Sequence, residues 1–492
     1  MTCRYSSVCL ALLLLLLLTS GSGAFRPDNQ AMTLAGFQYI NYIATSRAKV
    51  YFATTNGIII YNKLTNQWEE PLTGADGLGG TDIKRIWVDR FDEHLYAEQS
   101  SGLYEYNFTF ERWLSAMELP PIDSDDKHLP APTIMFPPFG FNYLGNGTMV
   151  DADSRSFTFS DLVDDGAGNL WIGTWGYGAA RAGTGSKNIE LLPYGLLQSA
   201  AYTLHDEDSV LWVSGPMLNS RRTGITGIDR EENRFTFLET GIHPDLPAVN
   251  INCLTGNQRY LIVGTETGML LIDRATQLVD KRIDRRRGFA DDNITSLQTV
   301  GQDSIFIGTT GGLLLYEISR DSVGSVAHRQ FFNNIIYDLT TSDGYLWIGS
   351  NVGAYRLSLE TGKLQRYQDP DQVLFNRVFD INKYGTYIWF ASDNGLVRLD
   401  LEDGSTTPYR VSSRKLDSRV MDVNDRIAVI SNESGITMIF LDDEELRTRD
   451  FSIEDGIAST YVYALHLDGD YLWIGTDKGL TRFLWNNPDR VD

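Results

Sequence analysis

The sequence predicts an all-β protein built from repeated four-stranded antiparallel sheets. One short phrase recurs along the 492 residues, most clearly as Leu170-Trp171-Ile172-Gly173-Thr174 and Leu472-Trp473-Ile474-Gly475-Thr476. A further glycine follows each of ten copies, and eight of the nine gaps between these glycines measure 40 to 46 residues. That period fits either a helical pair or a four-stranded propeller blade. The ten glycines are Gly57, Gly102, Gly178, Gly224, Gly268, Gly312, Gly353, Gly395, Gly435 and Gly479.

The residues within each unit favour the blade. Apolar runs are short, rich in β-branched and aromatic residues, and bounded by Gly, Asp and Asn, as is typical of strands. In one unit we predict strands over 375–382, 387–391, 396–401 and 407–411. Asp393-Asn394-Gly395 supplies the tight turn between the second and third of these strands. Four antiparallel strands in one period make one blade of a β-propeller.

The two ends of the chain predict a closed ring. The last unit stops after its third strand, at 480–485, while segment 30–36 precedes the first unit. We expect this N-terminal segment to supply the outer strand of the last blade, because closure removes exposed sheet edges. The even spacing favours one ring of about ten blades. The alternative is a ring of seven or eight blades with the extra repeats packed beside it.

The repeat resembles a known family. Asp164-Asp165-Gly166-Ala167-Gly168-Asn169-Leu170-Trp171-Ile172-Gly173-Thr174, with the Asp76-Gly77-Leu78 and Asp455-Gly456-Ile457 turns, is similar to the two-component regulator propeller repeat. The resemblance implies an extracytoplasmic, sensor-type β-propeller, a class in which several members recognise oligosaccharides. Sensor kinases of that class also carry a membrane span and kinase domains. This sequence shows neither, so direct signalling is not expected.

The first 24 residues predict a signal peptide. Arg4 is followed by an apolar run over 8–18 and by the small residues Ser22-Gly23-Ala24, so we expect cleavage before Phe25 and a propeller over 25–492. The apolar run is too short for stable membrane insertion. We therefore expect a secreted or periplasmic protein.

Composition and motifs exclude several classes of function. Lys and Arg total 42 against 64 Asp and Glu, a net charge of −22, and such a surface repels nucleic acid. Only Cys253 remains after the predicted signal, so no intrachain disulfide is expected. No HExxH, P-loop or dinucleotide fingerprint occurs, so we expect no metal, no cofactor and no catalytic set.

The predicted ligand site lies on the face that carries the loops between blades. The one long gap holds an excess of about 32 residues, read as a face-loop insertion at about 119–156 within a single repeat period. Aromatic rings beside amide and guanidinium donors suit a sugar. The alternative is that the insertion caps the central channel. The predicted binding residues are Phe141, Tyr143, Trp175, Tyr177, Asn219, Arg221 and Arg222.

A second candidate is the basic run Arg285-Arg286-Arg287. Its central residue, Arg286, is predicted to hold a carboxylate or sulfate group bidentately. The alternative is a solvated loop balanced by the neighbouring Asp284, Asp291 and Asp292.

These features together predict an exported, non-catalytic ligand-binding propeller whose expected ligand is an oligosaccharide. One alternative is a protein–protein interaction platform in the cell envelope, which an exposed apolar patch on the side of the ring would favour. Another is a propeller polysaccharide lyase, in which four residues would have to meet on the loop face. Those residues are His128, Tyr143, His243 and Arg222.

Overall fold

The computed structural model describes residues 31–486 except 79, 90–92, 109–111, 125, 208, 217–221, 241–242, 244, 290, 370–371, 394, 410–419 and 442–446. The predicted signal peptide, 1–24, lies outside the described residues. The described strands form nine four-stranded sheets and one of seven strands, all antiparallel. In this part of the chain no helix is long and apolar enough to cross a membrane.

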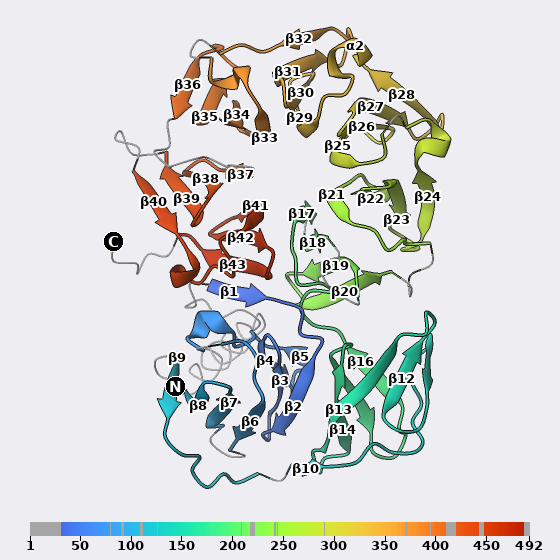
Figure 1. Ribbon diagram of the computed structural model, residues 1–492, viewed down its shortest axis with the longest axis vertical. Coiled ribbons are helices and arrows are strands. Elements are labelled where there is room, and N and C mark those ends of the chain that lie inside the picture. Colours follow the sequence, from blue (N-terminus) through green and yellow to red (C-terminus); the bar gives the residue numbers. More distant parts are fainter. Residues whose placement is uncertain are drawn as a thin grey trace, which may run out of the picture.

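Seven sheets form the upper ring of Figure 1. In chain order their strands are β17 (Thr203–Glu207), β18 (Val210–Ser214), β19 (Gly224–Asp229), β20 (Arg234–Glu239); β21 (Ile251–Gly256), β22 (Tyr260–Thr265), β23 (Gly268–Asp273), β24 (Val279–Ile283); β25 (Ile294–Val300), β26 (Ser304–Thr309), β27 (Gly312–Glu317), β28 (Ser322–Val326); β29 (Ile336–Ser342), β30 (Tyr345–Ser350), β31 (Gly353–Ser358), β32 (Leu364–Arg366); β33 (Val378–Tyr384), β34 (Tyr387–Ser392), β35 (Gly395–Asp400), β36 (Thr406–Tyr409); β37 (Met421–Val423), β38 (Ile427–Asn432), β39 (Gly435–Phe440), β40 (Thr448–Phe451); and β41 (Val462–Asp468), β42 (Tyr471–Thr476), β43 (Leu480–Leu484) with β1 (Ala31–Leu34).

The other three sheets lie below the ring in the same view. Their strands are β2 (Ile40–Thr45), β3 (Lys49–Thr54), β4 (Gly57–Asn62), β5 (Gln67–Trp68); β6 (Arg85–Val88), β7 (Leu95–Gln99), β8 (Gly102–Asn107), β9 (Arg112–Ala116); and β10 (Lys127–His128), β11 (Phe141–Tyr143), β12 (Thr148–Asp151), β13 (Ser156–Asp164), β14 (Asn169–Trp175), β15 (Ala179–Gly183), β16 (Ile189–Leu192). Short helical turns lie in the links: η1 (Gly74–Asp76), η2 (Arg285–Arg287), α2 (His328–Phe331), η3 (Val373–Phe375) and η4 (Ile453–Asp455).

The seven upper sheets close on themselves. Their inner strands follow one another from β17 through β21, β25, β29, β33 and β37 to β41, and β41 packs against β17 (Figure 1). The favoured ring of ten blades is therefore wrong, and seven repeats form the ring. In the remaining group β13 contacts β2, and β2 contacts β6.

The recurring phrase explains how neighbouring sheets pack. Its tryptophan is buried between sheets, as Trp347 and Trp473 show. Its glycine lies under the next sheet: a Cβ on Gly349 would lie 2.8 Å from the carbonyl oxygen of Val378, and one on Gly475 only 2.4 Å from that of Ala201. The last contact joins β42 to the segment before β17 and so forms the closing seam of the ring.

The same glycine contact shows why ten evenly spaced repeats do not form ten blades of one ring. A Cβ on Gly173, in the third repeat, would lie 2.6 Å from the side chain of Ile40 in the first repeat. The third sheet therefore packs back onto the first. Even spacing indicates that each sheet packs against another sheet, but it does not determine which sheet that is.

The N-terminal closure is confirmed. β1 pairs antiparallel with β43, from Ala31 opposite Phe483 to Leu34 opposite Leu480. Met32 and Leu34 are buried in this pairing. In the unit read strand by strand, β33 to β36 lie close to the predicted strands, although Val373–Phe375 forms the 3-10 turn η3.

The predicted face-loop insertion at 119–156 contains strands. β10 pairs with β13, while β11 and β12 extend the same sheet beyond β13. The structure therefore differs from a loop here, because 141–151 forms a hairpin that continues the third sheet.

The two groups of sheets share one buried core. Trp68 and Tyr194 of the lower group pack with Phe235 of β20. A buried ion pair joins Arg482 of β43 to Glu70, 2.8 Å apart. Near this junction η1 and η4, the two Asp-Gly turns noted in the sequence, line one cavity of about 550 Å3.

Candidate functional site on the propeller face

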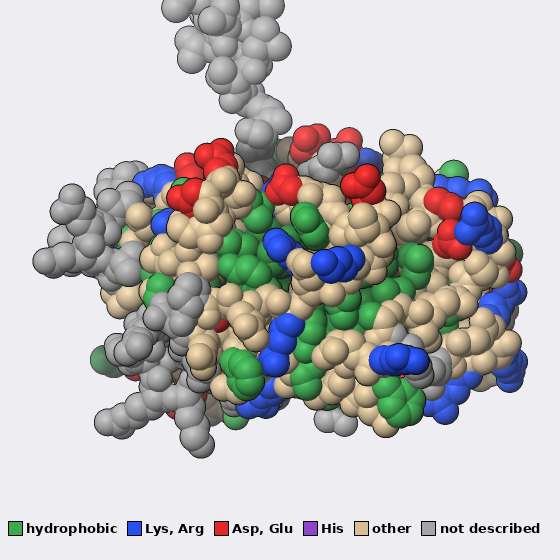
Figure 2. Space-filling model, turned by 90° about the horizontal axis from the view of Figure 1, so that it is seen from above, with side chains coloured by type: hydrophobic (Ala, Val, Ile, Leu, Met, Phe, Trp, Pro, Cys, Tyr) green, Lys and Arg blue, Asp and Glu red, His purple; other side chains and the backbone are tan. Residues whose placement is uncertain are grey.

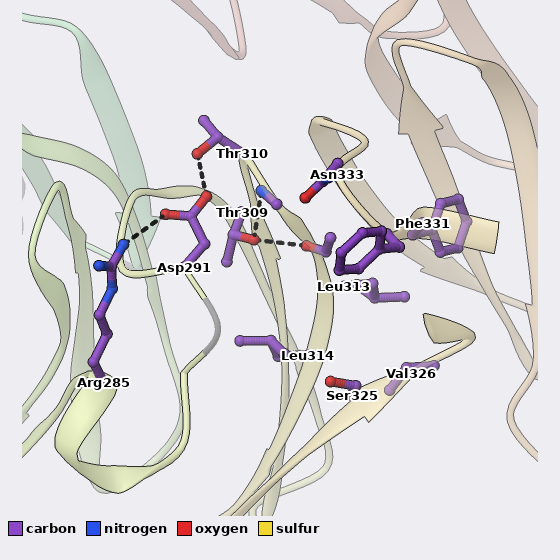
Figure 3. Close-up of a pocket in the computed structure, with 13 residues that line it drawn as sticks. Arg285, Asp291, Thr309, Thr310, Leu313, Leu314, Ser325, Val326, Phe331 and Asn333 are labelled. Atoms are coloured by element: carbon purple, nitrogen blue, oxygen red, sulfur yellow. Dashed lines mark hydrogen bonds and ion pairs between the residues drawn. The ribbon is translucent and has the colours of Figure 1, made fainter. Parts of the chain in front are cut away.

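The best-defined candidate site is a cavity of about 390 Å3 between η2 and α2. It lies on the face that carries the turns between second and third strands and the links between sheets. Figure 3 shows Arg285 and Asp291 on one side, the β26–β27 turn in the middle, and Phe331 and Asn333 on the other. Leu313, Leu314 and Val326 supply its apolar lining. We call it the face pocket.

η2 brings one arginine of the basic run to the rim of the face pocket. Asp284 caps the turn by accepting a hydrogen bond from the backbone N–H of Arg286, 3.0 Å away, and Gly288 ends it at φ 106°. Arg285 then pairs through Nε with Asp292, at 3.1 Å, and lies 4.0 Å from Asp291. Burial raises the pKa of Asp292, and Arg285 opposes this.

The β26–β27 turn forms the floor of the face pocket. The Thr309 hydroxyl donates to the carbonyl of Gly312, 2.9 Å away, and accepts from the N–H of Gly311, 3.1 Å away. The Thr310 hydroxyl donates to the Asp291 carboxylate. A Cβ on Gly311 would lie 2.9 Å from that of Asp291, so the turn leaves no room for a side chain there. The floor is thus fixed by hydrogen bonds, and polar atoms cluster along it.

The α2 segment supplies the aromatic side of the face pocket. Phe331, the last residue of α2, is buried, whereas Phe332 is 59% exposed beside the opening. Ala327 and Asn333 flank the helix in left-handed backbone conformations, at φ 49° and 58°. Such strained positions concentrate at functional sites. The link therefore presents a ring face and an amide group at the same opening.

The charges of the face pocket balance. Arg285 and Asp291 are the charged residues of its described lining, and the hydroxyl of Thr310 and the amide of Asn333 add neutral polar groups. The other arginine pair is separate, since Arg287 binds Asp321 at 2.6 Å. Donors, acceptors and one exposed aromatic ring suit an uncharged ligand with several hydroxyl groups. Among the described residues no group of three or more His, Cys, Asp or Glu is arranged to hold a metal ion.

Three of the sequence-predicted binding residues come together away from this pocket. The guanidinium of Arg222 lies 4.0 Å from the ring centroid of Tyr177, and the ring of Phe141 meets that of Tyr177 at 5.3 Å. Arg222 is 1% exposed and makes two hydrogen bonds to Glu239, of 2.9 and 2.6 Å. It also donates to the carbonyl of Tyr177. The desolvated ion pair lies within the β17–β20 unit, and the contacts of Arg222 with Tyr177 join that unit to the insertion sheet.

The other predicted residues are dispersed. Tyr143 stacks on Phe159 at 5.8 Å, and Trp175 is 44% exposed with its ring against that of Tyr39. Asn219 and Arg221 lie outside the described residues. Arg286 belongs to η2, but Arg285 is the member of the run that lines the face pocket.

The four residues of the lyase alternative make separate contacts. His128 pairs with Asp161 at 2.8 Å, and the ring of His243 binds the carbonyl of Gln277. Tyr143 donates to the carbonyl of Pro132, and Arg222 is held by Glu239. Within the described structure these contacts do not join the four side chains into one hydrogen-bonded set.

Sequence reasoning missed most of the face pocket. Its signal was the run Phe331-Phe332-Asn333-Asn334, two aromatic residues followed by two amides in a link between sheets. Residues of that kind on a surface link are candidates for binding. The pairing of Asp291 with Thr310 joins two different turns and leaves no pattern in the sequence.

Comparison with known proteins gives the fold. No protein-family model matches the sequence, and no curated protein is similar to it. The structure resembles PorZ, described as an essential surface component of the type-IX secretion system of Porphyromonas gingivalis, with 12% identity, 92% of this chain and 87% of that chain covered, and a TM-score of 0.58. The likeness is one of fold.

Two further solved structures match with TM-scores below 0.5. The extracellular domain of the putative one-component system BT4673 of B. thetaiotaomicron is 14% identical, over 92% of this chain and 71% of that one, with a TM-score of 0.45. Virginiamycin B lyase of Staphylococcus aureus is 13% identical, over 58% of this chain and 95% of that one, with a TM-score of 0.47. With the closed ring of sheets, the similarity to PorZ supports an all-β propeller architecture.

Proposed function

We propose that this protein is an exported, non-catalytic β-propeller that binds a neutral oligosaccharide through the face pocket. The observation that carries the proposal is that the exposed ring of Phe332 lines the same pocket as the polar group of Arg285, Asp291 and Thr310. The predicted signal peptide, and the resemblance of the repeats to extracytoplasmic sensor propellers, support export.

The chemistry of a sugar explains why these residues are suitable. One face of a sugar ring is apolar and stacks on an aromatic ring, while its hydroxyl groups need donors and acceptors in fixed directions. The hydrogen bonds of the β26–β27 turn hold such groups in place before a ligand arrives, which lowers the entropic cost of binding. A cavity of about 390 Å3 is of the size that small ligands occupy.

The test is to add neutral, uronic and sulfated oligosaccharides to the protein and to measure binding of each as a shift of the thermal unfolding midpoint. A ligand at about a hundred times its dissociation constant stabilises a protein by roughly 2.7 kcal/mol. Phe332→Ala should weaken binding of the neutral ligand about tenfold, because a stacked ring contributes about 1.4 kcal/mol. Arg285→Gln should weaken it as well.

Phe375→Ala is the matched control. Phe375 is also an exposed ring, 53% accessible, in the equivalent link of another sheet, and it lies outside the face pocket. Equal binding by the wild type and both Phe variants would refute the assignment to this pocket. If no oligosaccharide shifts the unfolding midpoint, the proposal of glycan binding is wrong.

A protein–protein interaction platform is the second candidate, and one specific observation favours it. Large apolar side chains are exposed along 114–144, the segment from β9 through the hairpin of the insertion. Figure 2 also shows hydrophobic side chains at the surface along the edge of the ring that holds β32 and α2. Exposed apolar area of this kind marks surfaces that partners cover. The side chains in 114–144 are Leu114, Met117, Leu119, Leu129, Ile134, Phe136, Phe139 and Leu144.

A further inference from the structure

The central channel of the ring is a second, chemically different cavity. It has a volume of about 460 Å3 and is lined by the inner strands of all seven sheets, β17, β21, β25, β29, β33, β37 and β41. Among its described lining residues there is no Lys or Arg, whereas Asp338, Asp380 and Asp422 all border it. The channel is therefore an open-ended space with acidic walls.

Aromatic rings gather at the end of the channel nearest the face. Tyr202 and Tyr463 stack with their centroids 3.6 Å apart across the closing seam of the ring. Tyr337 and Phe379 lie 5.3 Å apart on the neighbouring strands β29 and β33. Each of these four residues, which we call the aromatic collar, lies ten residues before the tryptophan of its own repeat. The collar is thus a product of the repeat and not of one unusual loop.

The carboxyl groups of the channel are held by the backbone of the next sheet. Asp338 accepts from the N–H of Ile381 at 2.9 Å, and Asp380 accepts from that of Met421 at 2.7 Å. Their two carboxyl groups also hydrogen-bond to each other. Burial raises the pKa of Asp338 to about 6, and burial together with Asp338 raises that of Asp380 well above its usual range. The pair therefore holds a proton to a higher pH than an isolated carboxyl group would.

The other titratable groups around the pair offer little compensating charge. Burial raises the pKa of Asp422 and of the Cys253 thiol. His466 lies between Asp206, at 3.0 Å, and Asp422, at 3.7 Å. His205 is occupied by Glu207 at 2.7 Å. The channel carboxyls thus have no lysine or arginine facing them within the described lining.

We propose that the channel binds a small organic cation with one or more ammonium groups, of the chemistry of a polyamine. The collar attracts a cation through the faces of its rings, and Asp338 and Asp380 supply the opposite charge. This site is distinct from the face pocket and does not depend on the proposed glycan binding.

Binding of such a cation is coupled to loss of a proton. A positive charge beside the Asp338–Asp380 pair favours the ionised form of both, so the shared proton leaves as the ligand enters. Affinity therefore rises with pH through about 6. His466 loses its own charge as the pH rises, and this acts in the same direction.

The experiment is calorimetric titration of the full chain with spermidine in 150 mM salt, at pH 5.5 and 7.5. Triethylene glycol, an uncharged chain of similar length, is the ligand control. We expect binding at pH 7.5 to be at least tenfold tighter than at pH 5.5. The heat should depend on the ionisation enthalpy of the buffer, because a proton is released.

Variants separate the channel from the acidic surface. The double variant Asp338→Asn with Asp380→Asn should lose this binding, as should Phe379→Leu in part. Asp321→Asn is the matched control, because Asp321 is a carboxylate outside the channel paired with Arg287. Spermidine binding that survives in the double variant, or that is equal at the two pH values, would overturn the proposal. So would binding of triethylene glycol with the same affinity, or absence of any heat at millimolar spermidine.

Discussion

Closure of the ring by seven sheets makes a sharp prediction at Gly475. A Cβ at this position would lie 2.4 Å from the carbonyl oxygen of Ala201, whereas ordinary contacts begin at about 3.4 Å. Gly475→Ala therefore forces the β41–β43 sheet and the segment before β17 apart by about 1 Å. Overpacking of this kind costs about 1–3 kcal/mol. For a chain of this size such a loss lowers the melting temperature by only a few degrees, since the unfolding entropy scales with length.

Guanidinium-induced unfolding followed by fluorescence of the ten tryptophans is the better assay. The control is Gly324→Ala, because no atom lies within 4 Å of a Cβ there, and it should leave stability unchanged or raise it slightly. Gly349→Ala, whose Cβ would meet Val378 between consecutive sheets, should resemble Gly475→Ala. If Gly475→Ala unfolds at the same denaturant concentration as Gly324→Ala, the closing seam is not where we place it.

Two further predictions concern charged groups. Arg222→Ala removes one of the two arginines that pair with the buried Glu239 and leaves Arg155 at 3.1 Å, so it should lower the free energy of unfolding by about 1.5–3 kcal/mol. Arg320→Ala, which breaks an exposed pair with Glu317, should cost no more than about 1 kcal/mol, and similar losses in denaturant unfolding would contradict the desolvated pair. Burial opposes ionisation of Glu207, but hydrogen bonds from His205 and Arg274 outweigh it and lower its pKa to about 2. Its stabilising effect is therefore complete above the unfolded pKa of 4.5 and is lost as the pH falls through about 2. Glu207→Gln should be less stable than the wild type at pH 7 and match it near pH 2, and a constant difference across this range would refute the assignment.

The local structure was largely readable from the sequence. The phrase around Trp347 combines a buried ring, a glycine at a close approach and a serine hydroxyl that bonds across the turn to the carbonyl of Gly353. These are contacts within one repeat or with the next, so their residues recur at fixed spacing. The closing strand was predictable for the same reason, because the last repeat visibly lacked its fourth strand and β1 supplies it.

The candidate site was much less predictable. Arg285 and its partner Asp292 lie in one link and were in view together, but Thr310 comes from the next turn, and Phe332 comes from the next link and had no special spacing. Phe141, Tyr177 and Arg222, which the sequence grouped as predicted binding residues, contact one another, and their role in binding stays a prediction. The burial of Arg222 could not be predicted, because the sequence does not show whether an arginine faces solvent or a buried Glu239.

The sequence by itself determined the four-stranded unit, its repetition and the closure by an N-terminal strand, because each rests on short-range hydrogen bonding and a recurring close contact. Only the tertiary structure decided that seven sheets close the ring while three pack beside it. Gly173 and Gly475 occupy the same place in the repeat, yet one lies under Ile40 and the other under Ala201. Which sheets pack together depends on the packing free energy summed over whole sheets, and the sequence of a single repeat does not determine that sum.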